Sequence, residues 1–395
     1  MSDTTYLDWP FFSDAHRALA RKFDDWAVSH FRSSVQEEDS YSACRNLVRL
    51  LGKSGWLAYI VPEAFGGAHP RLDLRSVCLI REKLAHESGL AEFAFAMQGL
   101  GSSPITLHGS DALQGRYLPG VCRGETIPAF AISEESAGSD VRAMRATAQR
   151  RGSEYVVNGQ KTWISNAGLA DFYVVFCRFP EQGENAFLAL VVEADNPGLE
   201  VVGRIETIAP HPLGTIAFAD CRVPSTALLG DEGKGLNVAF STLDIFRTTV
   251  AAAALGYARR ALEETVSHVR SRSVFGQMLA DQQLTKARVA EMEQDIDCSA
   301  LLVYRSAWNH DRGGRRNTRE SALAKLFATE CAQTVIDGAV QLFGARGVVA
   351  GSRVEALYRE IRALRIYEGT SEIQKLIIAE QVLKRAAQQM EVTHG

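Results

Sequence analysis

The segment 366–378, IYEGTSEIQKLII, combines a carboxylate, a glycine and a helix-start signal within a few residues. Ser371 and Gln374 have the spacing of a capping box, which predicts that a helix begins just after Ser371. Gly369 permits an unusual backbone turn before that helix, so Glu368 is expected on a non-helical approach segment. A carboxylate beside apolar neighbours can have a raised pKa and act as a general base. A solvated glutamate at a helix entrance would explain the same residues.

The segment 130–140, FAISEESAGSD, carries small residues and hydroxyls where a strand is expected to end. Gly138 allows close backbone approach, and Ser133 and Ser139 supply short hydrogen-bond donors, as a phosphate or the edge of a flavin ring would need. A polar β-turn would explain this segment equally well. The run Trp-Ile-Ser at 163–165 pairs a flat aromatic ring with a hydroxyl, although a core tryptophan beside a turn serine accounts for it nearly as well.

Two further stretches carry charge in the second half of the chain. Asp244 and Arg247 are three residues apart on an expected helix, so an internal ion pair is the default interpretation. Arg272 precedes Phe275 near an expected helix end, where an arginine beside an aromatic ring can hold an anion or can cap the helix. The sequence has no complete phosphate-binding loop, Rossmann fingerprint, GxSxG serine motif or HExxH zinc motif.

Hydrophobic spacing divides the chain into three parts and predicts an α+β protein. Residues 1–125 show helical spacing, residues 126–235 show short β-branched and aromatic runs, and residues 236–395 return to helical spacing. In the middle part, Asn158-Gly159 predicts a hairpin turn. The expected strands include 155–157, 172–179, 187–193, 199–202 and 215–219. The last part is expected to form a four-helix bundle from helices at 236–270, 282–311, 318–343 and 372–389.

Composition excludes several classes of protein. With 395 residues, 46% of them apolar and 23% charged, the chain is too ordinary in composition for a disordered, collagen-like or coiled-coil protein. A net charge of −4 gives no broad electrostatic footprint for nucleic acid. Seven scattered cysteines without a CxxC pair disfavour a disulfide framework and a metal site. Without a signal-peptide pattern or a long apolar run, the protein is expected to be cytoplasmic and not membrane-spanning.

Nine motifs in register resemble the acyl-CoA dehydrogenase family along most of the chain. They are VPEAFGG at 61–67, AISEESAGSD at 131–140, NGQKTWIS at 158–165, FADCRVP at 218–224, GDEGKGL at 230–236, LDIFR at 243–247, RSVFG at 272–276, QLFGARG at 341–347 and YEGTSEIQ at 367–374. The resemblance implies an N-terminal α-helical domain, a middle β-barrel or β-sandwich domain and a C-terminal four-helix bundle. It also implies FAD between the last two domains, and homo-oligomers, usually tetramers built as dimers of dimers.

The resemblance also implies roles for individual residues. Glu368 would be the catalytic base. FAD contacts would come from Phe130, Ile132, Ser133, Gly138, Ser139, Trp163, Ile164, Ser165, Arg272, Phe275, Gln282, Gln283, Gln341, Gly344, Ala345, Thr370 and Glu372, some of them across the dimer. Substrate contacts would come from Ser139, Asp244, Arg247, Tyr367 and Gly369.

The reaction implied by the resemblance is α,β-dehydrogenation of an acyl-CoA thioester to the trans-2-enoyl-CoA. Glu368 would remove the α-proton, FAD N5 would accept the β-hydride, and an electron-transfer flavoprotein would take the electrons. Some family members carry the base immediately before the arginine of LDxxR, where this chain has Phe246. The run Ala-Pro-His-Pro-Leu-Gly at 209–214 departs from the family pattern.

Two alternatives accompany this interpretation. The altered run at 209–214 leaves open an acyl-carrier-protein dehydrogenase of secondary metabolism. A flavin-bound regulatory or nucleic-acid-binding protein on the same fold would be expected to have a basic surface and to lack the base, and the charge balance and Glu368 argue against it.

Overall fold

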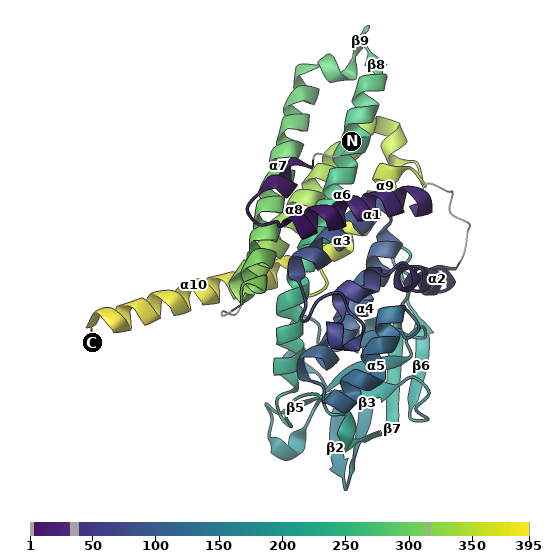
Figure 1. Ribbon diagram of the computed structural model, residues 1–395, viewed down its shortest axis with the longest axis vertical. Coiled ribbons are helices and arrows are strands. Elements are labelled where there is room, and N and C mark those ends of the chain that lie inside the picture. Colours follow the sequence, from purple (N-terminus) through teal and green to yellow (C-terminus); the bar gives the residue numbers. More distant parts are fainter. Residues whose placement is uncertain (1–3, 32–38, 314–316, 395) are drawn as a thin grey trace. The chain divides into compact units, whose positions relative to one another are not determined.

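A computed structural model describes residues 4–31, 39–313 and 317–394 of the chain (Figure 1). The chain divides into two compact units, which are described separately. The helical unit contains the residues up to 31, Leu74–Gly89 and the chain from Asp244 onward. The sheet unit contains residues 39–73 and Leu90–Leu243. The helices of the N-terminal third are therefore shared between the two units.

The sheet unit is built on a seven-stranded sheet within the described residues. Its strands follow the order β1-β4-β2-β3-β7-β6, with β5 paired to β4. The β1–β4 and β2–β4 pairs are parallel, and the other pairs are antiparallel. The strands are β1 (Pro128–Ala131), β2 (Thr147–Arg151), β3 (Glu154–Ser165), β4 (Phe172–Arg178), β5 (Phe187–Glu193), β6 (Leu199–Arg204) and β7 (Leu213–Pro224).

Burial along the strands explains why they could be read from the sequence. Strands β4 and β5 are buried along almost their whole length, which fits their continuous apolar runs. Strand β6 is exposed along almost its whole length and lies at the sheet edge. The helices α2 (Ser40–Lys53), α4 (Gly89–His108) and α5 (Asp111–Arg123) contribute to the same unit. The predicted β character of the middle of the chain is confirmed.

The hairpin predicted at Asn158-Gly159 is wrong, because both residues lie inside the continuous strand β3. Gly159 has a φ of +137° at a register shift in the β3–β7 pairing, and a Cβ there would lie 2.6 Å from Cα of Ala146. The glycine therefore serves a β-bulge and a close backbone approach. The turn between β2 and β3 occurs instead at Gly152, whose φ is +63°.

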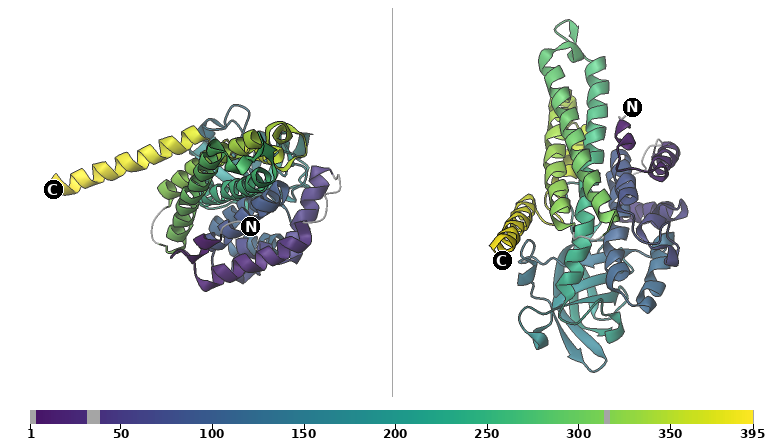
Figure 2. Two further views of the ribbon diagram at one scale, coloured as in Figure 1. Left: turned by 90° about the horizontal axis from the view of Figure 1, so that it is seen from above. Right: turned by 60° about the vertical axis from the view of Figure 1, so that its left-hand side comes forward.

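The helical unit is dominated by three long helices that lie side by side (Figures 1 and 2). They are α6 (Gly235–Ser271), which begins in the sheet unit, α7 (Gln283–Asp311) and α8 (Thr318–Phe343). The side chains of Thr248 on α6 and Ser306 on α7 are hydrogen-bonded at 2.9 Å. The unit also contains α1 (Asp14–Phe31), α3 (Leu74–Glu87), α9 (Arg353–Leu364) and α10 (Ser371–His394). The four long helices predicted after residue 235 are confirmed.

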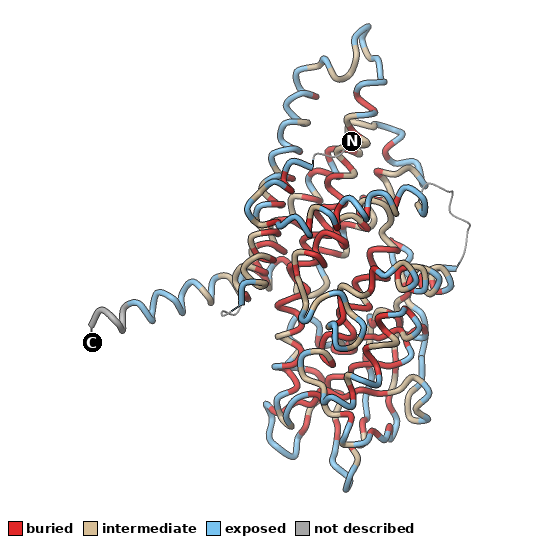
Figure 3. The backbone as a smooth tube through the Cα atoms, viewed as in Figure 1, coloured by how far each residue is buried: buried red, intermediate tan, exposed pale blue. Residues whose placement is uncertain are grey.

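Helix α6 is long and apolar enough to meet the composition criterion for a membrane span, alone among the helices of the described ranges. However, 83% of its most apolar window is buried inside the protein, which is the pattern of a core helix. Helix α10 begins against α8, but its C-terminal part extends away from α7, α8 and α9 in Figures 1 and 2 and is largely exposed in Figure 3.

Candidate active site

The carboxylate Glu368 lies on a tight backbone turn between α9 and α10. Its φ is +54°, and that of Gly369 is +92°, so two consecutive residues adopt the left-handed conformation. A non-glycine residue in this region is uncommon and costs on the order of 1 kcal/mol or more. Such strained residues cluster at functional sites, where the surrounding structure holds them in place. The predicted unusual turn before the last helix is confirmed.

Three buried side chains hold this turn by its backbone carbonyls. Arg247 Nε donates to the Glu368 carbonyl at 3.3 Å, and Lys325 Nζ donates to the Gly369 carbonyl at 2.7 Å. Gln374 Nε2 donates to both carbonyls, at 3.3 Å for Glu368 and 2.8 Å for Gly369. The donors come from α6, α8 and α10, so three helices fix the backbone of the candidate base.

The capping box predicted between Ser371 and Gln374 is wrong in detail. The first turn of α10 is capped one residue earlier, because Thr370 Oγ1 accepts the Ile373 N–H at 3.4 Å. Ser371 Oγ instead donates to the Glu330 carboxylate. The Gln374 amide is therefore available to hold the turn rather than to cap the helix.

Charged groups surround the turn, where the sequence suggested apolar neighbours. Arg247 Nη1 pairs with Asp244 Oδ1 at 2.9 Å, which confirms the predicted internal ion pair. Thr318 Oγ1 donates to the other oxygen of Asp244 at 2.6 Å. Burial lowers the pKa of Arg247, and the charges of Asp244 and Glu368 oppose that shift. Asp244 and Arg247 are thus first of all part of the scaffold that holds Glu368.

Lys325 and the contacts of Gln374 with the turn were not predicted from the sequence. Lys325 is fully buried, and burial lowers the pKa of its ammonium group to about 8. The neighbouring Glu368 carboxylate opposes this shift. One signal was present in the sequence, since Lys325 lies on the same face of α8 as the core residues Ala322 and Ala328.

In the sheet unit, the predicted flavin-edge residues lie together around the ends of β1 and β3. The Thr162 N–H donates to the Ser133 carbonyl at 3.0 Å, which joins the segment after β1 to the strand that carries Trp163. Trp163 has a φ of +55° at a register shift between β3 and β7, and its residue surface is 49% exposed. A bulge thus presents a large aromatic side chain outward, while the adjacent Ile164 is buried.

A buried ion pair supports this segment from within the sheet unit. Lys161 Nζ lies 2.8 Å from Glu134 Oε1 and donates to the Ile132 carbonyl at 3.0 Å. Glu134 also accepts the N–H groups of Arg145 and Ala146, at 2.6 and 3.0 Å. Burial acts to raise the pKa of Glu134, but Lys161 and these N–H groups hold it below its ordinary value. Neither charged residue could be given a role from the sequence alone.

These residues fit a flavin. Gly138 and Ser139 are exposed, and among the described residues no atom lies within 4 Å of the position that a Cβ of Gly138 would take. The half-exposed ring of Trp163 offers a flat apolar surface, and hydroxyls at Ser133, Ser139 and Ser165 offer hydrogen bonds.

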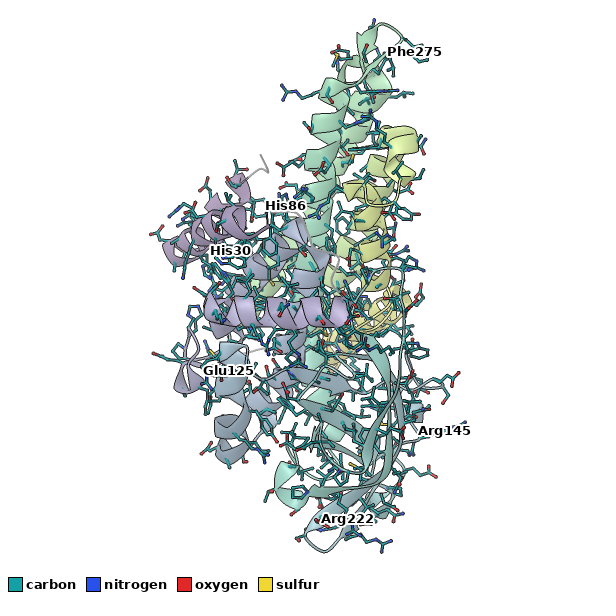
Figure 4. The ribbon with its side chains drawn as sticks, turned by 90° about the vertical axis from the view of Figure 1, so that its right-hand side faces the viewer. His30, His86, Glu125, Arg145, Arg222 and Phe275 are labelled. Carbon is teal, nitrogen blue, oxygen red and sulfur yellow. The ribbon has the colours of Figure 1, made fainter. Side chains whose placement is uncertain are left out.

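The remaining predicted cofactor residues of the helical unit lie at the other end of its long helices. Phe275 is 99% exposed on the loop between β8 (Ser273–Val274) and β9 (Gln277–Met278), directly after α6 (Figure 4). The ring of His268 on α6 stacks on that of Phe343 on α8, with the ring centroids 4.1 Å apart. This contact places the end of α8, with Gln341, Gly344 and Ala345, at the same end of the unit as Arg272, Gln282 and Gln283.

Arg247 and Ser271 are separated by 24 residues of the continuous helix α6, or about 36 Å at 1.5 Å per residue. One chain therefore does not bring the Arg272 and Phe275 group next to Glu368. Thr370, Glu372 and Tyr367 do lie beside Glu368 along the chain.

Family models match three consecutive parts of the chain. The N-terminal domain of acyl-CoA dehydrogenases matches residues 13–125, the middle domain matches residues 129–221 and the C-terminal domain matches residues 233–383. A cyclohexane-1-carbonyl-CoA dehydrogenase of Geobacter metallireducens is 34% identical over 86% of this chain and 90% of its own length.

Solved structures agree with the sequence comparisons. An acyl-CoA dehydrogenase of Bacillus anthracis in complex with FAD is 29% identical with a TM-score of 0.88, over 99% of this chain and 72% of its own. A prolyl acyl carrier protein oxidase is 26% identical with a TM-score of 0.86, over 94% of this chain and 99% of its own. The chain belongs to the acyl-CoA dehydrogenase family, and it is an oxidoreductase whose cofactor is FAD.

Proposed function

We propose that the protein catalyses α,β-dehydrogenation of an acyl-CoA thioester to the trans-2-enoyl-CoA, with Glu368 as the base. The observation that carries this proposal is the Glu368-Gly369 turn, where a strained carboxylate residue is fixed through its own carbonyl by buried donors from two helices. A group that must meet one C–H bond in one orientation needs such preorganisation.

The chain's own residues would divide the work as follows. Glu368 accepts the α-proton on its carboxylate, while Arg247, Lys325 and Gln374 prevent the turn from moving. Bound FAD would supply the acceptor for the hydride of the β-carbon. Ser139, Tyr367 and Gly369, with the Asp244–Arg247 pair, are proposed to contact the thioester end of the substrate. Phe246, which occupies the alternative base position of some relatives, is buried and cannot take a proton.

The distance along α6 supports a proposal of homo-oligomers, with a tetramer as the expected form. Because the Arg272 and Phe275 group lies about 36 Å along α6 from Arg247, it would serve the flavin of a second copy. The exposed apolar residues Leu376 and Leu383 on the projecting helix α10 would likewise be covered by another chain. An electron-transfer flavoprotein is the proposed electron acceptor, in the cytoplasm.

An acyl-carrier-protein substrate is the second candidate. The loop 209–214 is tied to the flavin-edge strand, because the Asn166 N–H donates to the Pro212 carbonyl at 3.0 Å. Within this loop, His211 packs on Phe93 of α4 with ring centroids 4.6 Å apart. The likeness to a prolyl acyl carrier protein oxidase favours testing this candidate beside acyl-CoA.

The test is anaerobic titration of the FAD-loaded protein with short, medium, branched and cyclic acyl-CoAs, and with a prolyl carrier protein. A cyclic acyl-CoA enters the panel because of the relative that acts on cyclohexane-1-carbonyl-CoA. Bleaching of the oxidised flavin by an acyl-CoA is expected. Bleaching by the carrier-protein thioester alone would move the second candidate forward, and a fully loaded protein that no thioester reduces would contradict both.

The variant Glu368→Gln tests the base within the same titration. It is nearly isosteric, so FAD and the fold should be retained while flavin reduction slows by several orders of magnitude. Near-normal reduction in this variant would reject the assignment of Glu368.

A further inference from the structure

Lys325 is the most unusual ionisable residue near the turn, because its ammonium is completely buried. It lies on α8, which packs against α7, α9 and α10. Its Nζ donates to the Gly369 carbonyl at 2.7 Å, one residue after the candidate base. Burying an ammonium group is expensive, and a neutral amide or hydroxyl could make the same hydrogen bond. The positive charge therefore needs a reason of its own.

The charged groups around Lys325 point to Glu368 as that reason. Glu330 on α8 already pairs with Arg365 at 2.7 Å and accepts from Ser371, and Glu372 on α10 is exposed. On the α6 side, Arg247 has its own partner in Asp244. Glu368 directly precedes the Gly369 carbonyl that Lys325 Nζ binds at 2.7 Å, and its charge acts to raise the pKa of Lys325.

We propose that Lys325 is a positioning residue for Glu368, fixing the turn through the Gly369 carbonyl and, by its charge, keeping Glu368 as the carboxylate that can accept a proton. This inference rests on the proposed function of Glu368. Enclosing a carboxylate disfavours its charged form, and a protonated Glu368 cannot act as a base. The attraction between Lys325 and Glu368 is mutual, so it stabilises the ionised state of both.

Three substitutions separate the charge from the hydrogen bond. Lys325→Gln keeps a donor without charge, Lys325→Arg keeps the charge, and Lys325→Met removes both. Lys384→Gln, at a lysine paired with Glu380 on the exposed part of α10, is the control for loss of a lysine charge. Each FAD-loaded protein is mixed anaerobically with the acyl-CoA that bleaches the wild type best, and the rate of flavin reduction at saturation is measured from about pH 6 to about pH 10.

The expected result is a change in the shape of the pH profile. In Lys325→Gln the acid limb should move about 1 unit to higher pH, so reduction on that limb is about tenfold slower than in the wild type. The two profiles should converge above about pH 9, because the pKa of Lys325 is about 8 and the wild type also loses this charge there. Lys325→Arg and Lys384→Gln should keep the wild-type limb, and Lys325→Met should slow reduction at every pH in addition to moving the limb. KM should change little.

A purely structural role gives a different result. It predicts that Lys325→Gln runs parallel to the wild type at every pH, and that outcome overturns the proposal, as does a shifted limb in Lys325→Arg. Glu368→Gln in the same series keeps the two levels of inference apart. If Glu368→Gln reduces normally, the proposed function fails; if it is inactive while Lys325→Gln runs parallel to the wild type, only the role of Lys325 fails.

A second measurement covers variants that do not fold. The wild type and Glu368→Gln are prepared with lysine labelled with carbon-13 at the ε position, and the lysine resonances are followed against pH. A resonance that titrates near pH 8 in the wild type should titrate at lower pH in Glu368→Gln, because the stabilising carboxylate is gone. An unchanged midpoint would show that the two groups are not coupled.

Discussion

The substitution Lys161→Met should strongly destabilise the sheet unit. Lys161 is completely buried. Its Nζ lies 2.8 Å from Glu134 Oε1 and donates to the Ile132 carbonyl at 3.0 Å. Methionine fills a similar volume but leaves the Glu134 carboxylate buried beside two backbone N–H groups and no cation. Removing one partner of a buried ion pair costs about 3 to 5 kcal/mol. At about 2 to 4 °C per kcal/mol, the melting temperature should fall by about 6 to 20 °C.

The assay is calorimetric unfolding of the FAD-loaded and FAD-free protein, with Lys53→Met as the control at an exposed lysine of the same unit. The penalty of Lys161→Met should shrink as the pH falls below about 4.5. The pKa of Glu134 is lowered in the folded state, so the stability that its charge confers is present above its unfolded pKa and lost as the pH falls through the folded value.

A double-mutant cycle decides whether the pair itself is responsible. Replacing both partners, as Lys161→Met with Glu134→Gln, should cost less than the sum of the single substitutions, because no buried charge is left uncompensated. FAD affinity should fall in the single variants, since the pair supports the segment that carries Ser133. Additive losses in the cycle, or a melting temperature within 2 °C or so of the wild type for Lys161→Met, would refute this reasoning.

Three further predictions concern other parts of the chain. Gly369→Ala should lower the free energy of unfolding by about 1 to 2 kcal/mol, because φ is +92° and the new Cβ would lie 2.7 Å from Gln374 Nε2. Flavin reduction should slow in this variant while FAD is retained. The control Gly351→Ala, at φ +86° in open space, should leave flavin reduction unchanged. Phe275→Asp should leave the circular dichroism of the chain unchanged but lower FAD content and oligomer mass; full FAD content and unaltered association would count against cross-subunit binding. His86→Gln should destabilise the protein near pH 5.5 or so and hardly at all near pH 9 or so. Burial acts to lower the pKa of His86, but the hydrogen bonds to Glu263 and Glu87 outweigh burial, so the pKa is raised in the folded protein. The stability that protonated His86 contributes is therefore fully present below the unfolded pKa of 6.5 and is lost as the pH rises through the folded pKa. Equal losses in melting temperature at both pH values would contradict this.

Elements whose pattern is local could be predicted from the sequence. The expected helix at 318–343 coincides with α8, because one buried stripe leaves a helical period in its sequence. The expected strand at 187–193 coincides with β5, because continuous burial leaves an unbroken apolar run. The Asn158-Gly159 pair wrongly predicted a hairpin turn, because the positive φ of Gly159 belongs to a β-bulge within β3. That bulge depends on how β3 pairs with β7, which the local sequence does not show.

The candidate base could be found from the sequence, but most of the groups that hold it could not. Glu368 and Gly369 are adjacent, and Gln374 follows within a turn and a half of helix, so their motif is visible. Arg247 and Lys325 reach the same turn from 121 and 44 residues away. No local period encodes such a contact, and only the packing of α6 and α8 against the start of α10 creates it.

This construction separates the chemistry of the reaction from the choice of substrate. The side chains that hold the Glu368 turn donate to its backbone carbonyls within the helical unit, and none of these contacts depends on what the acyl chain contains. The pH shift expected for Lys325→Gln should therefore be the same for every acyl-CoA that reduces the flavin. A substitution in the loop at 209–214, such as His211→Ala, should instead change KM by different factors for different thioesters and leave the acid limb in place.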